Sequence, residues 1–407
     1  MEHHRFSSTG SSSDSNHIQT GLTSLSSQRS LASVPSLNSH SHHHLENLPT
    51  TSHNCLTTFK GNTSYISSLT LVGKFLYTGS SDREIRSWNH TPFHHSEFNP
   101  QQSTSNIVVA GKGAVKSIVV HCNKLFSAHQ DHKIRVWKIK TNSENDQKYT
   151  LLATLPTFGD RVSKLLIPKN HVQIRRHKKC TWVHHVDAVS SLALSKDGTL
   201  LYSVSWDRTI KVWRTKDFTC LESLNNAHDD AINAVAVSYD GYVYTGSADK
   251  RIKVWKKGGE IGGEKKHSLV DTLEKHKSGI NALALNSDGS VLYSGACDRS
   301  ILVSEKDVNG KLVVVGALRG HTKSILCLAV VSDLVCSGSE DKTIRIWRSV
   351  HRDQYSCLGV LEGHRGPIKS LTAVVVDHRD SSETSFLVYS GSLDCDIKMW
   401  QIFVPVL

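Results

Sequence analysis

From residue 55 onward, short runs of alternating apolar and polar residues are separated by turn residues. Runs 228–237 and 321–330 begin with a His, have an apolar residue four positions later, and alternate from there. This period of two is typical of strands that bury one face. Shorter runs such as 201–204 and 210–213 follow, and four strands fit into each repeating unit. The pattern predicts an all-β fold built from repeated four-stranded units.

The repeat itself is marked by an Asp followed six residues later by a Trp. It occurs at Asp82/Trp88, Asp131/Trp137, Asp207/Trp213, Asp249/Trp255, Asp341/Trp347 and Asp394/Trp400. A seventh unit has Asp298, with Ser304 where the Trp is expected. A hydroxyl residue stands four positions before every one of these Asp residues: Thr78, Ser127, Ser203, Thr245, Ser294, Ser337 and Ser390. The spacing therefore predicts seven structural repeats.

With this spacing of Asp, hydroxyl and Trp residues, the chain resembles the WD40 repeat family over residues 56–403. The resemblance implies a seven-bladed β-propeller, in which closure of the ring removes exposed sheet edges. Residues 56–60 read as an outer strand with no inner strands before it, and the last unit ends after its third strand near Phe403. We therefore expect the first strand to complete the last blade.

The domain boundaries follow from composition. Residues 1–54 are rich in Ser and His and are expected to be disordered, because they have too few apolar side chains to offset the entropy of ordering. Residues 55–403 form the propeller, and residues 404–407 a C-terminal tail. The mildly apolar stretch 29–37 is interpreted as inert tail, with a docking or phosphorylation segment as the alternative.

The WD40 resemblance also implies a hydrogen-bonded set of four side chains in each blade. The His meets the Asp and the hydroxyl, and the hydroxyl meets the Trp. Complete sets are expected in blades three, four, six and seven: His185, Ser203, Asp207, Trp213; His228, Thr245, Asp249, Trp255; His321, Ser337, Asp341, Trp347; His364, Ser390, Asp394, Trp400. Blade five lacks only the Trp. Blades one and two have Asn62 and Gly111 at the His position and are expected to be more mobile.

The same resemblance implies that partners dock on the face that carries these turns, near the central opening. The candidate partner-binding residues are Tyr65, Lys116, Gln130, Trp206, Asn233, Asn281, Leu326, Glu340, Lys369 and Leu393. Trp206 is the main anchor candidate, with Tyr65, Leu326 and Leu393, because Trp is enriched in binding hot spots. The alternative is a partly buried turn residue with no partner.

Charge adds a second candidate surface. The formal net charge is +11, and most of it falls after residue 55. An insertion at 158–182, before blade three, contains Arg175, Arg176, Lys178 and Lys179 and is expected on the face of the His and Asp turns. It is interpreted either as a nuclear import signal or acidic-partner contact, or as a solvated basic loop.

Several classes of function are disfavoured. Ser, His and Asp recur in four or more blades, whereas an active site occurs once, so we expect no enzyme and no cofactor. The nine cysteines contain no C-x-x-C pair, which favours reduced thiols in an intracellular protein. The cluster His40, His42, His43 and His44 is interpreted as adventitious, so no metal site is predicted. No apolar run is long enough for a membrane helix.

A narrower resemblance concerns 172–177 (Val-Gln-Ile-Arg-Arg-His) and 182–190 (Trp-Val-His-His-Val-Asp-Ala-Val-Ser), together with 220–231 and 389–394. These segments resemble the plant JINGUBANG-like WD40 proteins. This implies a monomeric, non-enzymatic scaffold for protein–protein interactions in a plant regulatory pathway concerned with transcription, growth or pollen. The expected partners are transcription factors or signalling proteins in the nucleus, the cytoplasm or both.

Two alternatives remain open. The first is a nucleic-acid-associated propeller that uses the basic insertion. The second is a ubiquitin-ligase substrate receptor. The absence of a Trp-Asp-x-Arg box argues against it, because no repeat-ending Trp is followed by Asp.

Overall fold

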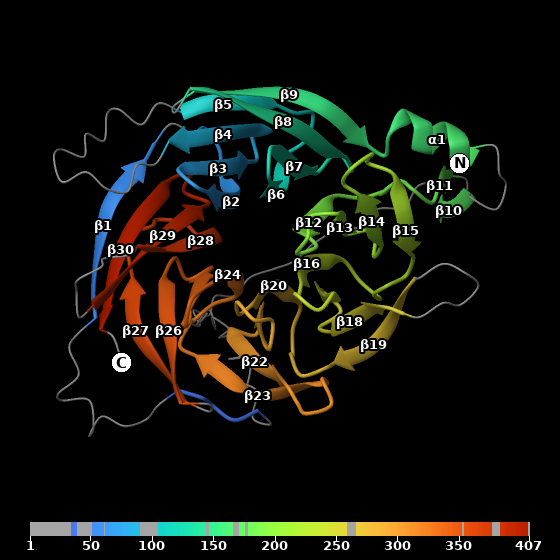
Figure 1. Cartoon of the computed structure of the whole chain (residues 1–407). Coiled ribbons are helices and arrows are strands. Elements are labelled where there is room, and N and C mark those ends of the chain that lie inside the picture. The colour runs from blue at the N-terminus through green and yellow to red at the C-terminus, as the bar shows by residue number, and fades with distance from the viewer. Residues whose placement is uncertain are drawn as a thin grey trace, which may run out of the picture. The chain divides into compact units, whose positions relative to one another are not determined.

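A computed structural model describes residues 34–38, 51–60, 62–89, 105–143, 146–165, 171–175, 178–258, 266–351, 354–376 and 383–405. Seven four-stranded antiparallel sheets follow one another in a ring (Figure 1). The predicted all-β, seven-bladed propeller is therefore confirmed. The innermost strands of neighbouring blades contact one another around the centre.

The first three blades contain strands β2 to β9 and β12 to β15. Blade one contains β2 (Ile66–Val72), β3 (Phe75–Ser80), β4 (Glu84–Asn89) and β5 (Ser105–Ala110). Blade two contains β6 (Val115–His121), β7 (Lys124–His129), β8 (Ile134–Ser143) and β9 (Asp146–Leu155). Blade three contains β12 (Val189–Leu194), β13 (Leu200–Ser205), β14 (Ile210–Arg214) and β15 (Cys220–Leu224).

The remaining blades repeat this order from the inside outward. Blade four contains β16 (Ile232–Val237), β17 (Tyr242–Ser247), β18 (Ile252–Lys257) and β19 (His267–Leu273). Blade five contains β20 (Ile280–Leu285), β21 (Val291–Ala296), β22 (Ser300–Lys306) and β23 (Leu312–Arg319). Blade six contains β24 (Ile325–Val331), β25 (Leu334–Ser339), β26 (Ile344–His351) and β27 (Gln354–Leu361). Blade seven contains β28 (Ile368–Val376), β29 (Glu383–Ser392), β30 (Ile397–Pro405) and β1 (Ser52–Phe59).

The ring is closed by pairing of the first strand with the last. β1 lies antiparallel to β30, with Ser52 opposite Phe403 and Phe59 opposite Ile397, so the predicted closure is confirmed. Both expected domain boundaries are wrong by a few residues. β1 already begins at Ser52, and β30 continues to Pro405 with Val404 buried, because both segments find strand partners there. The expected disorder of residues 1–54 lies mostly outside the described residues.

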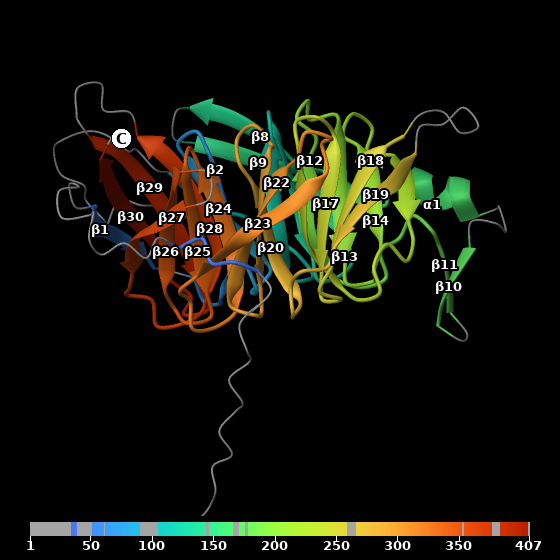
Figure 2. The same ribbon diagram turned by 90° about the horizontal axis from the view of Figure 1, so that it is seen from below.

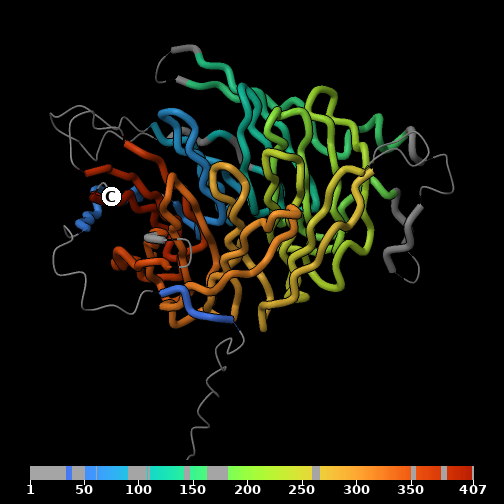
Figure 3. Tube along the Cα trace, turned by 60° about the horizontal axis from the view of Figure 1, so that its bottom comes forward, coloured from blue at the N-terminus to red at the C-terminus, as the bar shows by residue number. Residues whose placement is uncertain are grey.

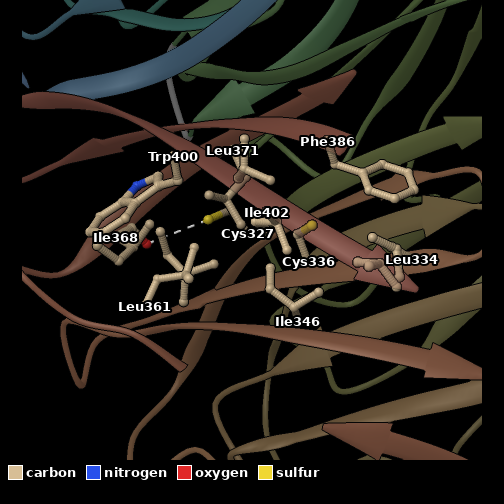
Figure 4. Close-up of a cluster of buried hydrophobic side chains, with 13 residues drawn as sticks. Cys327, Leu334, Cys336, Ile346, Leu361, Ile368, Leu371, Phe386, Trp400 and Ile402 are labelled. Atoms are coloured by element: carbon tan, nitrogen blue, oxygen red, sulfur yellow. Dashed lines mark hydrogen bonds between the residues drawn. The ribbon is translucent and has the colours of Figure 1, made fainter. Parts of the chain in front are cut away.

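The hydrophobic core is divided into layers between neighbouring blades. Figure 4 shows the layer between blades six and seven, where Leu334, Ile346 and Cys336 face Ile368, Leu371 and Trp400. The inner strands mix buried and half-buried residues. The second strands, such as β17 and β25, are buried almost throughout, because neighbouring blades cover both of their faces. This packing holds the turns at the strand ends in fixed positions.

The insertion before blade three is folded in its described part. It contains α1 (Phe158–Leu165) and a hairpin of β10 (His171–Arg175) and β11 (Lys178–Thr181). Thr157 caps α1, because its Oγ1 accepts the Asp160 N–H at 3.1 Å. The Asp160 carboxylate accepts the Cys220 N–H of β15, the outermost strand of blade three.

The expected placement of the insertion on the face of the His and Asp turns is wrong. It lies at the outer edge of the ring beside blade three (Figures 1 and 2), because β9, from which it continues, is an outermost strand. Among the described residues, no helix has the length and apolar character needed to cross a membrane.

Candidate functional site

The four side chains expected to meet in each blade lie within hydrogen-bonding distance in blades three, four, six and seven. In blade three, His185 Nδ1 is 3.0 Å from Asp207 Oδ2 and Nε2 is 2.8 Å from Ser203 Oγ. Trp213 Nε1 donates to the same Ser203 oxygen at 2.9 Å. The equivalent bonds join His228, Thr245, Asp249 and Trp255; His321, Ser337, Asp341 and Trp347; and His364, Ser390, Asp394 and Trp400.

Electrostatics in blade three favour a neutral imidazole beside an ionised carboxylate. Burial lowers the pKa of His185, although the Asp207 carboxylate opposes that shift. Burial disfavours ionisation of Asp207, but His185 and the hydrogen bonds to Thr209 and Val186 hold the pKa of that carboxyl well below its usual range. With a neutral His, every donor in the set has an acceptor. These side chains therefore stiffen the blade.

The Asp residues also fix the turn between the second and third strands. Asp207 Oδ1 accepts the Thr209 N–H at 2.9 Å. The residue after each of the seven Asp residues has positive φ although none is Gly: Arg83, His132, Arg208, Lys250, Arg299, Lys342 and Cys395. Such backbone is costly and persists only where surrounding contacts hold it. Six of these seven side chains are Arg, Lys or His, so the turns carry a series of basic groups.

Blade two obtains its imidazole from a position that the repeat does not predict. His129, at the end of β7, places Nε2 2.8 Å from Ser127 Oγ, which also accepts the Trp137 indole N–H at 3.1 Å. A Cβ on Gly111 would come within 3.2 Å of the His129 ring. The prediction that blade two lacks this imidazole is therefore wrong. Gly111, at the expected His position, leaves space for a His from the facing turn.

Blades one and five remain incomplete. In blade one, Asn62 Oδ1 accepts a hydrogen bond from Arg86 at 2.8 Å, so an amide and a guanidinium occupy the region of the His. In blade five, His276 contacts Asp298 and Ser294, but the buried Ser304 Oγ finds no hydrogen-bond partner among the described residues. Blade five is thus the blade with an unsatisfied polar atom in place of the indole.

The same scaffold builds the central face, on which the partner-binding residues were predicted. In every blade the residue before the Asp donates its N–H to the carbonyl three residues after the His position. The pairs are Ser81–Tyr65, Gln130–Ala114, Trp206–Ala188, Ala248–Ala231, Cys297–Gly279, Glu340–Ser324 and Leu393–Pro367, at 2.8 to 3.1 Å. Gln130, Trp206, Glu340 and Leu393 are therefore held at equivalent positions around the ring, and Tyr65 lies at the acceptor position of the same pair in blade one.

Trp206 is the most prominent apolar side chain of this face. It is 40% exposed, although Ser205 before it is fully buried. The Lys116 ammonium of blade two lies 5.1 Å from the Trp206 ring centroid. Burial lowers the pKa of Lys116, and the charge of Lys369 in blade seven lowers it further. Lys116, Lys369 and Trp206 thus form a basic and aromatic group, and Leu393 is also exposed.

Some predicted partner-binding residues mainly join neighbouring blades. Asn233 Nδ2 donates to the Ile280 carbonyl and Asn281 Nδ2 to the Ile325 carbonyl, both at 2.9 Å. Ser190 and Ser67 hydroxyls make the equivalent bonds to Ile232 and Val115. The recurrence of Ser or Asn five residues after the His position is the sequence signal for this role. Asn233 and Asn281 therefore bond the inner strands together.

The other predicted residues are distributed as follows. Tyr65 and Leu326 are half-buried, and Gln130 and Lys369 are exposed. The Glu340 Oε1 atom lies 3.9 Å from the Lys323 Nζ atom. In the insertion, Arg175 pairs with Lys178 and Lys179 with Gln173 in the β10–β11 hairpin, while Arg176 lies outside the described residues. The structure does not bring the insertion together with Trp206. Among the described residues, no group of three or more His, Cys, Asp or Glu could hold a metal ion, and the His40–His44 cluster is outside them.

The model of the family described as "WD domain, G-beta repeat" matches residues 53–89, 177–214, 218–256, 267–303, 312–348 and 355–401. The unmatched stretch between the first two segments contains blade two, where the His comes from another position.

Among curated proteins, human kinesin-like protein KIF21B is 24% identical over 368 residues, covering 87% of this chain and 20% of that protein. ROOT INITIATION DEFECTIVE 3 of Arabidopsis thaliana is 29% identical over 211 residues, covering 47% and 46%. The ribosome biogenesis protein YTM1 of Coccidioides immitis is 26% identical over 271 residues, covering 65% and 46%. The chain thus spans between a fifth and about half of these relatives. The solved WD40 propeller domain of Doa1 shares the fold with a TM-score of 0.61 at 20% identity, covering 86% of this chain and 96% of that one.

Proposed function

Because the chain belongs to the WD domain, G-beta repeat family, we propose that it is a non-enzymatic scaffold that binds a partner protein on its central face. The observation that carries this proposal is Trp206. A large aromatic side chain is 40% exposed at a turn whose backbone is fixed by the Ala188 carbonyl and by the Asp207 side chain. A rigid exposed indole is the kind of residue that dominates protein interfaces.

The charge around Trp206 favours an acidic partner segment. Lys116 lies over the ring, Lys369 is close enough to lower the pKa of Lys116, and Arg208 follows in the same turn. A partner that places an apolar side chain on Trp206 and carboxylates beside the two Lys residues would offset the repulsion between Lys116 and Lys369. Charge complementarity of this kind also raises association rates.

The Ser–His–Asp groups support a structural role. Ser203 is fully buried, and its Oγ accepts the Trp213 N–H while it contacts His185. A nucleophile must reach a substrate carbon, and this oxygen is enclosed by the blade. A hydroxyl, a His and an Asp meet in the same way in four further blades.

The biological setting is proposed from resemblance. The likeness of 172–177 and 182–190 to JINGUBANG-like proteins supports a regulatory role in a plant, with transcription factors or signalling proteins as partners in the nucleus, the cytoplasm or both. One relative at 29% identity is the Arabidopsis protein ROOT INITIATION DEFECTIVE 3, and YTM1 is described as a ribosome biogenesis protein.

The test is quantitative capture of proteins from plant tissue by the intact chain, by Trp206→Ala and by Tyr239→Ala, at low and moderate salt. Tyr239 is a matched control: it is 57% exposed, lies under the Lys196 ammonium at 3.7 Å, and sits in the turn between the first and second strands, at the opposite strand ends from Trp206. We expect a specific set of proteins to be retained at moderate salt by the intact chain and Tyr239→Ala and lost from Trp206→Ala.

Other outcomes favour the alternatives. If Trp206→Ala retains the same proteins as the intact chain and this retention is lost at moderate salt, the proposal is overturned in favour of nucleic-acid binding by the insertion. Co-purification of a ligase adaptor would favour a substrate receptor.

A further inference from the structure

A short segment from the expected tail is seated between two blades at the outer edge of the ring. Val34–Asn38 runs parallel to β23 of blade five and reaches β27 of blade six (Figure 3, the short blue stretch beside the orange strands). The Ala317 N–H donates to the Pro35 carbonyl at 2.9 Å, and the Leu37 N–H donates to the Ala317 carbonyl at 3.0 Å. The Tyr355 N–H of β27 donates to the Leu37 carbonyl at 2.8 Å. The segment is therefore recognised as an added strand.

Two apolar side chains of the segment pack into separate hydrophobic clusters. Leu37 is buried among Tyr293, Val303, Leu318, Trp347 and Tyr355, between blades five and six. Val34 is buried against Leu302 and Ala317 on the other face of blade five. Alternate side chains thus point to opposite sides of β23, which gives the groove two positions of side-chain selection.

Two residues of blade five make room for the segment. The three heavy atoms nearest to a Cβ built on Gly316 all belong to Leu37, so Gly316 makes room for that side chain. Leu302, four residues after Asp298, replaces the Arg or Lys that stands there in every other blade, and it contacts Val34. The departure at Leu302 is explained by the segment, whereas the position of Gly316 is also Gly in blade six, at Gly359.

Polar contacts fix the ends of the segment. The Asn38 amide makes two hydrogen bonds to the backbone of Arg319: its Oδ1 accepts the N–H at 3.0 Å, and its Nδ2 donates to the carbonyl. The Arg319 guanidinium donates to the Val34 carbonyl at 2.7 Å. Only Asn or a near equivalent offers both a donor and an acceptor at that position.

We propose that this groove is a peptide-binding site for an extended Val-Pro-x-Leu-Asn segment of a partner protein, and that the chain's own Val34–Asn38 occupies it as an intramolecular competitor. Blade five already has four strands, as has every other blade, so the propeller does not need a fifth. Pro35 and Ser36 are exposed, which leaves the middle position free to vary. An intramolecular segment acts at high effective concentration, so a partner binds well only when the segment is released.

The experiment uses the full chain and a fluorescent peptide of residues 31–40, Leu-Ala-Ser-Val-Pro-Ser-Leu-Asn-Ser-His. We expect the peptide to bind Leu37→Asp, in which the own segment is released, at least tenfold more tightly than it binds the unchanged chain. Asn38→Ala is a milder substitution and should also bind the peptide more tightly than the unchanged chain does. It serves as a second variant in case Leu37→Asp does not fold. A peptide with Asp in place of the Leu that corresponds to Leu37 should not bind either variant.

Two further variants define the site. Adding Gly316→Val to Leu37→Asp should abolish peptide binding and leave the melting temperature unchanged, because the new side chain fills only the space of Leu37. Trp206→Ala should not affect peptide affinity, so failure here is distinguishable from failure of the proposed central-face function. The proposal is overturned if folded Leu37→Asp and Asn38→Ala do not bind the peptide, or if binding is indifferent to Gly316→Val.

Discussion

The Nε2 atom of His129 lies 2.8 Å from the Oγ atom of Ser127. Ser127 precedes His129 by two residues in β7, the second strand of blade two, so both side chains point to the same side of that strand. In four other blades the imidazole that meets the equivalent hydroxyl and an indole comes from the connection before the first strand. His129 instead is the last residue of β7, and its Nδ1 contacts the Gly113 carbonyl at 3.0 Å rather than an Asp. Asp131 is left to pair with Arg135.

This relationship predicts that His129→Ala destabilises the protein about as much as His228→Ala. Both variants leave a buried hydroxyl without its imidazole, which costs roughly 1–3 kcal/mol. Chemical denaturation followed by Trp fluorescence measures the loss. A cost near zero for His129→Ala beside a clear cost for His228→Ala would contradict a shared role.

Acid should weaken blade two through His129. Burial lowers the pKa of His129 to about 4 from its ordinary 6.5, with Arg135 also lowering it and Gly113 and Asp131 raising it. The unfolded chain therefore binds this proton more readily than the folded one. The stability contributed is complete above pH 6.5 and is lost as the pH falls toward 4, with a slope of at most about 1.4 kcal/mol per pH unit.

Unfolding free energy measured from pH 7 to 4 checks this expectation. His129→Gln should flatten the slope in that interval, whereas His53→Gln, at an exposed position in β1, should leave it as it is. An unchanged slope in His129→Gln would show that other groups cause the acid sensitivity.

Ser304→Ala should stabilise blade five. Ser304 is fully buried, and its Oγ has no hydrogen-bond partner among the described residues, so removing the hydroxyl relieves a desolvation cost of about 1 kcal/mol or more. Ser203→Ala is the matched control, because its hydroxyl contacts His185 and Trp213 and its loss should destabilise. Thermal melting of the two variants should move in opposite directions.

Closure of the ring should depend on Phe59 far more than on its neighbour Leu56. Phe59 is buried, and its ring centroid lies 5.5 Å from that of Trp88 in blade one. Leu56, in the same strand, is exposed. Phe59→Ala should cost about 3–5 kcal/mol and Leu56→Ala less than about 1 kcal/mol in unfolding free energy. If Phe59→Ala and Leu56→Ala lowered the free energy of unfolding by similar amounts, β1 would contribute little to closure of the ring.

The sequence predicts the number of blades because the Asp, the hydroxyl and the Trp of one repeat lie close together in the chain. Their spacing survives in blade two even though the His does not. His129 is not predicted because the repeat pattern expects the imidazole before the first strand, whereas in blade two it comes from the second strand, two residues after Ser127. Trp206 could be placed on the central face because it precedes Asp207.

Contacts between distant segments were harder to predict. The docking of Val34 and Leu37 joins residues separated by more than 250 positions from β23 and depends on Gly316 and Leu302, whose meaning appears only beside the segment. The basic residues of the insertion do not indicate its folded part, in which Thr157 and Asp160 cap a helix and Asp160 accepts a hydrogen bond from β15.

The pairing of β1 with β30 has a consequence for synthesis on the ribosome. β1 is synthesised early but can join its sheet only after β30 has been made. In the pair that is nearest in sequence, Phe59 lies opposite Ile397, 338 residues later. Until then Phe59 and the facing surfaces of blades one and seven are uncovered, a state that is prone to aggregation. Chaperone demand during translation should therefore persist until the last strand appears, although the middle blades can fold earlier.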